Sequence, residues 1–547
     1  MPRYKPIPSV IPFTMSLLHV KNYRLTVLTI AITATLIPLY FMESKVLQHT
    51  HGVFAYPLDD TYIHLAVAKN LAMNNIWGIS AHKFASASSS ILYPLVLAAI
   101  FKIAGAHIVI PFVLNIIVAI IFLIVVQSWL DRQEINPSAQ LAILLTGVFL
   151  TPLPLLIMVG MEHTLHLLFL FLFITSFTAS FEKAKTIRFR PKVYIYALLL
   201  IATRYESMSV IILSCLLTAF YRNWGATLRL FLVGATPILI FGIYSLTKGS
   251  DFIPNSVLLK SAIPPLTVNG ISDYLDSQFC ARLFLPAEYF VAATQRLFLI
   301  LSLTLLLFRK EIAENKAFMY MLLILLLCCL FHLCFMIYSL FPRYEAYLIG
   351  NSMIICSTLF FKYNKFTFRE NTFAMEGVIA LIILFIIGPV ILRSWKGFDR
   401  ASLAAISIYD QQYQMGQFVH QYYDNESIAF NDIGAVSYLS HGKNLDLWGL
   451  GNIDIARSRR KHYNSPEFLD SISRKENVRI AIVFEYPFRK LLKKWKKVAS
   501  WDVPYNNASG FDSVSFYAVG TEEAPRLINN LKNYQSSLPP GVIVKYY

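Results

Sequence analysis

The chain has 547 residues, of which 56% are hydrophobic, 14% aromatic and only 15% charged. A chain of this length and composition is too apolar for a soluble protein and too long for a single membrane span, so we predict a polytopic membrane protein. The net charge of +16 does not indicate nucleic acid, because the basic residues gather in short clusters between apolar runs, as they do in cytoplasmic loops.

The first apolar run, residues 25–42, follows several basic residues and has no small-residue cleavage site after it. These are features of an uncleaved signal anchor whose N-terminus faces the cytoplasm. Residues 193–221 are interrupted by Arg204-Tyr205-Glu206 and predict a helical hairpin. Counting the two arms of this hairpin, we predict eleven membrane spans. The other nine are residues 25–42, 109–129, 140–159, 164–181, 226–246, 289–308, 317–340, 345–361 and 373–392.

Residues 90–104 are apolar but short, and their placement decides the side of everything that follows. If this segment lies in the membrane interface, every later basic cluster faces the cytoplasm, whereas a spanning segment would export those clusters. We therefore predict interfacial helices over residues 60–105, inside a first outer loop at 44–108. Residues 1–392 would form a transmembrane domain. Apolar alternation at 427–430 and 479–484 predicts strands among helices, and thus a small extracytoplasmic α/β or α+β domain over residues 393–547.

Asp59 and Asp60 follow the first strongly apolar segment and come before a helical pattern at 62–73. Carboxylates beside a bilayer are costly to place, so the pair indicates a reacting group or a bound cation. The structural alternative is that Asp60 caps the helix. A cap needs one aspartate and not two, which favours the chemical interpretation.

A reaction at the outer face needs a donor already carried there, and a lipid phosphate fits because nucleotide-activated donors are cytoplasmic. Arginine suits a phosphate better than lysine does, and Asp59 or Asp60 would accept the proton of an acceptor hydroxyl. We assign donor phosphate or sugar binding to Glu162, Arg204, Glu206, Asn255, Lys260, Arg343 and Tyr344.

Each of these assignments has a structural alternative. Arg204 with Glu206, and Arg343 with Glu345, would then be local ion pairs at helix ends. Lys260 would extend to the lipid headgroups, and Glu162 would be an N-cap. His163 and His166 have the spacing of metal ligands, but histidines on a helix that enters the membrane more often bond to neighbouring residues, and we assign no metal ligand.

Several segments resemble, in chain order, the outer loops of GT-C glycosyltransferases. Among these enzymes, the resemblance is to the subgroup that uses polyprenyl-phosphate sugars and is similar to the mycobacterial terminal arabinofuranosyltransferase. The resemblance covers residues 25–460, and the chain departs from the family pattern at Ala66, Tyr205, Val257 and Leu258. The matching motifs are Asp59-Asp60-Thr61-Tyr62-Ile63, Ala68-Lys69-Asn70-Leu71-Ala72, Ser88-Ser89-Ser90-Ile91-Leu92-Tyr93-Pro94-Leu95, Gly160-Met161-Glu162, Arg204-Tyr205-Glu206, Pro254-Asn255-Ser256 with Lys260, Asn431-Asp432-Ile433-Gly434-Ala435 and Asp446-Leu447-Trp448-Gly449-Leu450.

The resemblance implies an inverting transferase that moves a sugar, arabinofuranose in that subgroup, from polyprenyl phosphate to a cell-envelope glycan at the outer face of a bacterial cytoplasmic membrane. By the resemblance, one aspartate of the pair would be the catalytic base. We assign that role to Asp59, with Asp60 positioning a donor hydroxyl or a helix, although the sequence itself does not order the two. Asp432, Asp446 and Trp448 would bind the acceptor or form a lid. No cofactor is required if the cations stabilise the leaving phosphate, and the alternative is a Mg or Ca ion.

A transporter or flippase of lipid-linked sugars is the competing class of protein. Transporters commonly carry their ionisable residues at the middle of the membrane, on broken helices in matched halves. In this sequence the acids gather at one predicted face and the two halves do not correspond, which favours the transferase.

Overall fold

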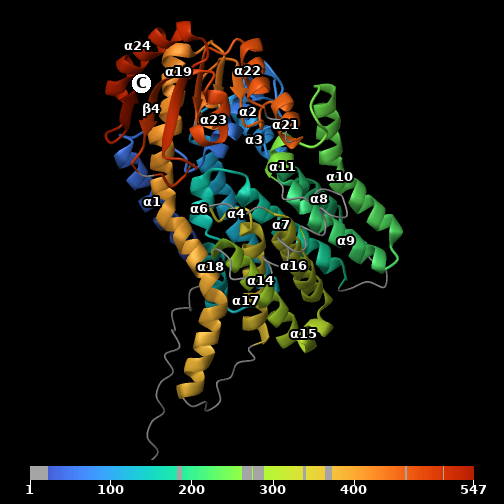
Figure 1. The fold of residues 1–547 in the computed structure, drawn as a ribbon. Coiled ribbons are helices and arrows are strands. Elements are labelled where there is room, and N and C mark those ends of the chain that lie inside the picture. The colour runs from blue at the N-terminus through green and yellow to red at the C-terminus, as the bar shows by residue number, and fades with distance from the viewer. Residues whose placement is uncertain are drawn as a thin grey trace, which may run out of the picture.

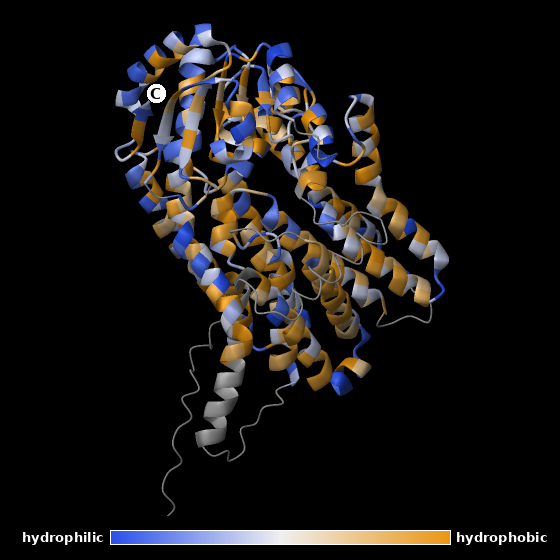
Figure 2. Ribbon diagram, in the orientation of Figure 1, coloured by the Kyte–Doolittle hydropathy of each residue, from blue (hydrophilic) through white to orange (hydrophobic). Residues whose placement is uncertain are grey.

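The computed structural model describes residues 23–181, 188–260, 274, 289–336, 341–363, 373–461, 465–504, 506–508 and 510–547, without the side chains of 260, 289–290 and 373–383. A body of apolar helices carries a C-terminal α/β domain at one end (Figure 1). The helices of the body are mainly hydrophobic, and hydrophilic residues are more frequent in the α/β domain (Figure 2). The predicted fold class, a polytopic helical protein with a C-terminal α/β domain, is confirmed.

Near its start the helical body contains two shorter helices, over Asp59–Asn74 and Leu92–Ala104, and longer apolar helices lie around them. Within it η1 (Ala179–Phe181) and η2 (Tyr205–Ser207) are short 3-10 turns. Its α-helices are α1 (Tyr23–His49), α2 (Asp59–Asn74), α3 (Leu92–Ala104), α4 (Ile110–Arg132), α5 (Pro137–Leu150), α6 (Leu153–Val159), α7 (His163–Thr178), α8 (Pro191–Thr203), α9 (Met208–Phe220), α10 (Trp224–Thr247), α11 (Asn255–Lys260), α14 (Tyr289–Leu307), α15 (Arg309–Glu314), α16 (Lys316–Phe335), α17 (Ala346–Tyr363) and α18 (Phe373–Ile408).

Several helices are long and apolar enough to cross a membrane, so the protein is a multi-pass membrane protein. Among the described residues there are five, namely α1, α4, α10, α16 and α7 with η1, and a sixth span if α5 and α6, bent by 42°, count as one. The arms α8 and α9 of the predicted hairpin have 13 residues each. A helix of that length rises about 20 Å, less than the roughly 30 Å hydrocarbon core. The total of eleven spans and the direction of insertion stay predictions.

A six-stranded mixed sheet forms the centre of the α/β domain, in the order β2-β1-β3-β5-β4-β6. The first three strands are parallel and the others pair antiparallel. The strands predicted at 427–430 and 479–484 are present as β1 and β3. The strands are β1 (Ile428–Phe430), β2 (Asn444–Asp446), β3 (Ile480–Val483), β4 (Lys496–Asp502), β5 (Ser513–Ala518) and β6 (Ile543–Tyr546).

Helix α18 connects the body to this domain without a break, as the long gold helix in Figure 1 shows. It passes through residue 392, where we place the domain boundary from the sequence, and continues through a π-helical turn (Tyr409–Tyr413). The domain's helices are α19 (Gln414–Tyr423), α20 (Gly434–Leu439), α21 (Ile453–Arg460), α22 (Pro466–Lys475), α23 (Glu485–Leu492) and α24 (Ala524–Tyr534), with 3-10 turns η5 (Thr521–Glu523) and η6 (Gln535–Ser537).

The first loop packs against the α/β domain where α2 meets α20. The backbone N–H groups of Gly434 and Ala435 donate to the two carboxylate oxygens of Asp59, at 2.6 and 2.8 Å. One end of α2 is thus fixed by a carboxylate at the N-terminus of α20, where unpaired N–H groups favour an acid. At the other end, Lys69 Nζ donates to the carbonyl of Tyr438 at 2.9 Å.

We predict that Gly434→Ala loosens this junction. A Cβ at position 434 would lie 2.0 Å from the backbone oxygen of Asp59, a contact that only backbone movement relieves, so we expect a loss of about 1–3 kcal/mol in stability. Differential scanning fluorimetry in detergent should show a lower Tm, and limited proteolysis should cut the junction faster. Gly225→Ala is the matched control, because nothing lies within 4 Å of its Cβ. Equal Tm values for the two variants would contradict the packing.

Candidate active site

Four helix ends bring their polar residues together below the α/β domain. The first two turns of α2 carry Asp60 and His64, the turn before α7 carries Glu162, and the break between α8 and α9 carries Arg204. The segment before α17 adds Arg343 and its neighbours. Helix ends suit this task because their unpaired backbone groups already require polar surroundings.

Glu162 is the centre of the first ion-pair network. Its side chain is fully buried, and Arg204 Nη1 lies 2.5 Å from its Oε1. His64 Nε2 lies 3.1 Å from Oε2, and Ser89 Oγ donates to Oε1 at 3.1 Å. Burial opposes ionisation of Glu162, but His64 and Arg204 outweigh it and hold the pKa of this carboxyl well below its usual range.

Arg204 also binds a second acid from its own segment. Its Nη2 and Nε donate to the two oxygens of Glu206 at 2.5 and 3.1 Å, a bidentate pair. The local Arg204–Glu206 pair that we consider from the sequence is therefore present. Burial opposes ionisation of Glu206, and Arg204 nevertheless lowers the pKa of that carboxyl.

Arg343 forms the second network and pairs with Asp60, not with Glu345. Its Nη2 lies 2.7 Å from Asp60 Oδ2, and its Nη1 lies 2.8 Å from the Met161 sulfur. Glu345 instead pairs with Arg393 of α18 at 2.5 Å. The alternative that Arg343 and Glu345 form a local pair is wrong, because Arg343 pairs with Asp60 of α2 and Glu345 with Arg393 of α18.

Tyr344 connects the two arginines. Its ring lies 4.8 Å from the Arg343 guanidinium and 5.2 Å from that of Arg204. Its hydroxyl accepts a hydrogen bond from Arg343 Nη2 at 3.2 Å. An aromatic face between two guanidinium groups reduces their mutual repulsion, and so lets two cations stand close together.

A cavity of about 420 Å³ opens beside these groups. Its wall is mostly apolar and includes two positions at which the sequence departs from the family pattern, Tyr205 and Val257. The other described apolar lining residues are Met208, Ile212, Phe331, Phe335 and Met336. Its polar lining is Ser89, Arg204, Glu206, Ser209, Ser256 and Tyr344. A charged end and an apolar wall together suit an amphiphile with an anionic head.

Asp59 has a different environment from its neighbour. Its carboxylate is occupied by the two N–H groups of α20, and Asp432 lies near enough to repel it. Gln412 Nε2 donates to Asp432 at 2.7 Å. Burial and then Asp432 raise the pKa of Asp59 from 3.8 to about 8, with the two N–H groups opposing them.

The remaining predicted site residues lie at the edge of this arrangement. Asn255 is buried at the start of α11 and donates to the carbonyl of Leu450 at 3.4 Å. Lys260 ends the same helix, and its side chain lies outside the described part of the structure. Asn255 therefore connects the body to the domain that carries the predicted acceptor residues.

Asp446 and Trp448 lie in the turn after β2. The N–H groups of Trp448 and Gly451 each donate to Asp446 at 2.7 Å. Burial raises the pKa of Asp446 to about 6. One face of the Trp448 ring is covered by the Arg459 guanidinium at 3.7 Å, so a sugar would have to stack on the other face.

Sequence reasoning assigned no role to His64, Met161 or Arg393. His64 had a signal, because it follows Asp60 by four positions and so shares its helix face. Arg393 had none, since it lies in an apolar run 48 positions from its partner. Of the two histidines considered as metal ligands, His166 places Nε2 2.6 Å from Ser207 Oγ and stacks on Tyr347.

Comparisons with known proteins support the fold. Residues 404–517 match a family model described as a domain of unknown function (DUF8728). No curated protein matches the chain. The crystal structure of ArnT from Cupriavidus metallidurans bound to undecaprenyl phosphate is similar, with a TM-score of 0.52, 10% identity, and coverage of 92% of this chain and 99% of that chain.

Two further solved structures are less similar. They are the apo state of the same ArnT (TM-score 0.48, 9% identity, 92% and 99% coverage) and the Archaeoglobus fulgidus oligosaccharyltransferase complex with Zn and sulfate (TM-score 0.46, 11% identity, 95% and 74% coverage). The likeness to the first structure shows that the chain has a GT-C fold, as its loop motifs predict. Membership of the arabinofuranosyltransferase-like subgroup stays a prediction.

We predict that Glu162→Gln destabilises the whole body. The change leaves the buried Arg204 with one fewer anion, and breaking a buried pair costs about 3–5 kcal/mol. Scanning fluorimetry in detergent should show a clearly lower Tm. Glu467→Gln is the control, because that carboxylate is exposed and lies 3.6 Å from Lys494; its Tm should not change. Equal Tm values for both variants would show that Glu162 does not organise the network.

Asp59 predicts a pH dependence of stability. The pKa of Asp59 is about 8 in the folded protein, against 3.8 for the unfolded chain. The protonated side chain therefore contributes its full stability below pH 3.8, and this contribution is lost as the pH rises through the folded-state pKa of about 8. The Tm advantage of wild type over Asp59→Asn should therefore shrink from about pH 5 to pH 8 and then level off. An advantage that grows with pH would mean that the α20 N–H groups lower this pKa.

Proposed function

We propose that the protein is a membrane glycosyltransferase that moves a sugar from a polyprenyl-phosphate donor to a cell-envelope glycan at the outer face of a bacterial cytoplasmic membrane. The observation that carries the proposal is the cavity of about 420 Å³ whose apolar wall ends at Arg204 and Tyr344. A prenyl chain fits the wall and a phosphate fits the charged end. The GT-C fold supports it, and the similar ArnT is described as bound to undecaprenyl phosphate.

The charge balance defines what the donor phosphate needs. Among the described residues, two guanidinium groups, Arg204 and Arg343, face three carboxylates, Asp60, Glu162 and Glu206. A phosphate that joins them requires a further cation or the displacement of one carboxylate. We assign that cation to Lys260, at the end of α11, with no metal required. A Mg or Ca ion between carboxylate and phosphate is the alternative, and sensitivity of turnover to a chelator would distinguish them.

Asp60 is the better candidate for the general base. Both oxygens of Asp59 accept N–H groups of α20 and hold it against the α/β domain, whereas Asp60 pairs with Arg343, which also contacts Tyr344 of the cavity wall. This order reverses our sequence-based assignment of the base to Asp59, and it makes Asp59 a positioning residue that fixes α2.

The reaction is then a direct displacement. Asp60 takes the proton of an acceptor hydroxyl, the oxygen forms a bond to the anomeric carbon, and the bond from that carbon to the phosphate oxygen breaks on the opposite face. Prenyl phosphate leaves with the electron pair, so the configuration inverts. Arg204 and Arg343 stabilise the charge that develops on phosphate, a contribution usually worth a hundredfold or more in rate.

The acceptor would approach from the α/β domain. Asp432, Asp446 and Trp448 lie on this domain, and a sugar that stacks on Trp448 would use the ring face opposite Arg459. Arabinofuranose, the sugar of the resembling subgroup, is the first donor sugar to test. Tyr205 and Val257 line the cavity at positions that differ from that subgroup, so a panel of pentose and hexose donors is needed.

We predict that Asp60→Asn lowers release of prenyl phosphate by a hundredfold or more, because a general base typically contributes 10²–10⁴-fold. Purified protein would be incubated with synthetic prenyl-phosphate sugars and an envelope glycan extract, and free prenyl phosphate measured by mass spectrometry. Asp454→Asn, a change at an exposed aspartate of α21, should keep full turnover.

Asp59→Asn distinguishes the two acids in the same assay. We expect it to lower Tm more than the chemical rate, whereas Asp60→Asn should do the reverse. Lost turnover with unchanged Tm at position 59 would return the role of base to Asp59. Donor binding without release across the whole panel and extract would instead favour a transporter.

A further inference from the structure

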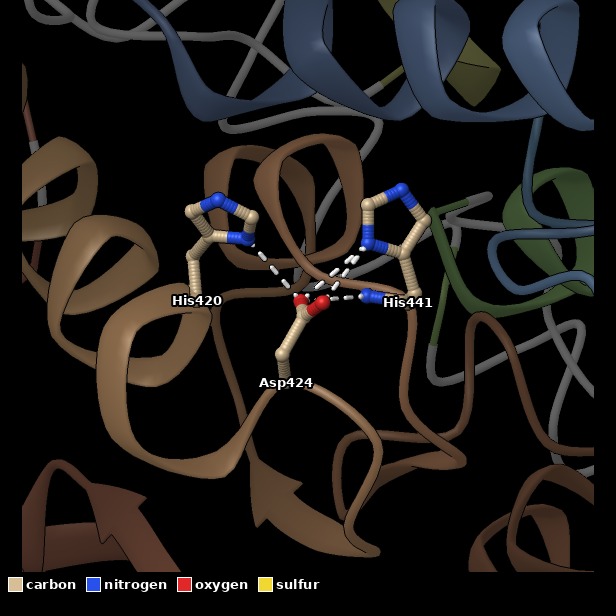
Figure 3. A group of neighbouring side chains, drawn as sticks. All are labelled: His420, Asp424 and His441. Atoms are coloured by element: carbon tan, nitrogen blue, oxygen red, sulfur yellow. Dashed lines mark hydrogen bonds and ion pairs between the residues drawn. The ribbon is translucent and has the colours of Figure 1, made fainter.

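Two histidines and an aspartate, none of them part of the candidate active site, converge on the surface of the α/β domain (Figure 3). His420 lies in the last turn of α19, Asp424 follows four positions later at its C-cap, and His441 lies between α20 and β2. The Nδ1 atoms of both imidazoles lie 3.0 Å from the same carboxylate. About half of each histidine side chain is exposed.

The arrangement has the composition and spacing of a metal site. One ligand atom from each residue lies within 4.8 Å of the other two. Two imidazole nitrogens and one carboxylate oxygen are the three-ligand set that zinc takes when its fourth position is left to water. Among the described residues this is the one group of three such side chains close enough to share an ion.

Asp424 is also held for coordination by a backbone hydrogen bond. The N–H of His441 donates to Oδ1 at 3.1 Å, which leaves Oδ2 to face the ion. Metal-bound carboxylates are commonly oriented by such outer hydrogen bonds. The hydrogen bonds from the two Nδ1 atoms are the contacts that an ion would replace, since neutral imidazole binds metal through an unprotonated nitrogen.

We propose that His420, Asp424 and His441 bind one divalent transition-metal ion of the zinc class. The site does not depend on the proposed transferase activity. It connects instead to the junction between α2 and the α/β domain, because Lys69 of α2 approaches it.

Lys69 gives the proposal a specific consequence. Its Nζ lies 3.4 Å from His441 Nε2, and an ammonium only donates, so Nε2 accepts and the imidazole proton is on Nδ1. Binding of an ion at Nδ1 moves that proton to Nε2, where it faces the ammonium. Lys69 therefore opposes the ion, and replacing it with an uncharged side chain should tighten binding.

The test uses the full-length protein in detergent, with any histidine tag removed and metal stripped by a chelator. ZnCl2 alone is titrated by isothermal calorimetry and by competition with a chromophoric chelator. We expect one ion per chain, at least tenfold weaker binding in His420→Ala, His441→Ala and Asp424→Asn, and tighter binding in Lys69→Met. Cobalt in place of zinc should give the visible absorption of a four-coordinate ion.

His49→Ala is the matched control. Its imidazole also pairs with an acid, Asp410, at 3.0 Å, but belongs to no group of three, so zinc binding should not change. His420→Ala and His441→Ala should keep the wild-type Tm without metal, because both histidine side chains are about half exposed. Absence of binding, or binding that His420→Ala and His441→Ala leave unaltered, would overturn the proposal.

Discussion

The buried carboxylate of Glu162 is the constraint on which the candidate site depends. A charge with no exposure to solvent is costly unless cations and donors surround it, and Glu162 obtains them from three other segments, through Arg204, His64 and Ser89. The contacts of the Glu162 side chain therefore fix the positions of α2, the break between α8 and α9, and the start of α7 relative to one another. The cavity lies against that fixed frame, because Arg204 and Ser89 also line it.

The second network explains how this frame reaches the α/β domain. Arg343 pairs with Asp60 on the first turn of α2, and Asp59, one position earlier, accepts the N–H groups of α20. The same helix end thus contacts the arginines on one side and the domain on the other. Movement of the domain would displace Asp60 as well, so under the proposed mechanism the binding of an acceptor to the domain and the geometry of the proposed base are linked through α2.

The sequence was informative where partners lie close along the chain. Apolar runs predicted helices, alternation predicted β1 and β3, and the local Arg204–Glu206 ion pair, considered as the structural alternative to donor binding, is present. It was uninformative where partners are distant. Arg343 pairs with Asp60 across 283 positions, and Gly434 meets Asp59 across 375, so no local spacing marks them. Span number stays open for a related reason, because 13-residue apolar helices have neither the length of a span nor the polarity of a loop.

Neighbouring acids could not be ordered from the sequence for a geometric reason. Successive residues of a helix point about 100° apart, so Asp59 and Asp60 face different surroundings that only the folded chain supplies. Replacing the aspartate with an uncharged asparagine therefore has different effects at the two positions. An asparagine at 59 turns an amide donor toward the N–H groups of α20 and disturbs packing, whereas at 60 it mainly removes the charge opposite Arg343. Loss of turnover identifies a base only when stability is measured beside it.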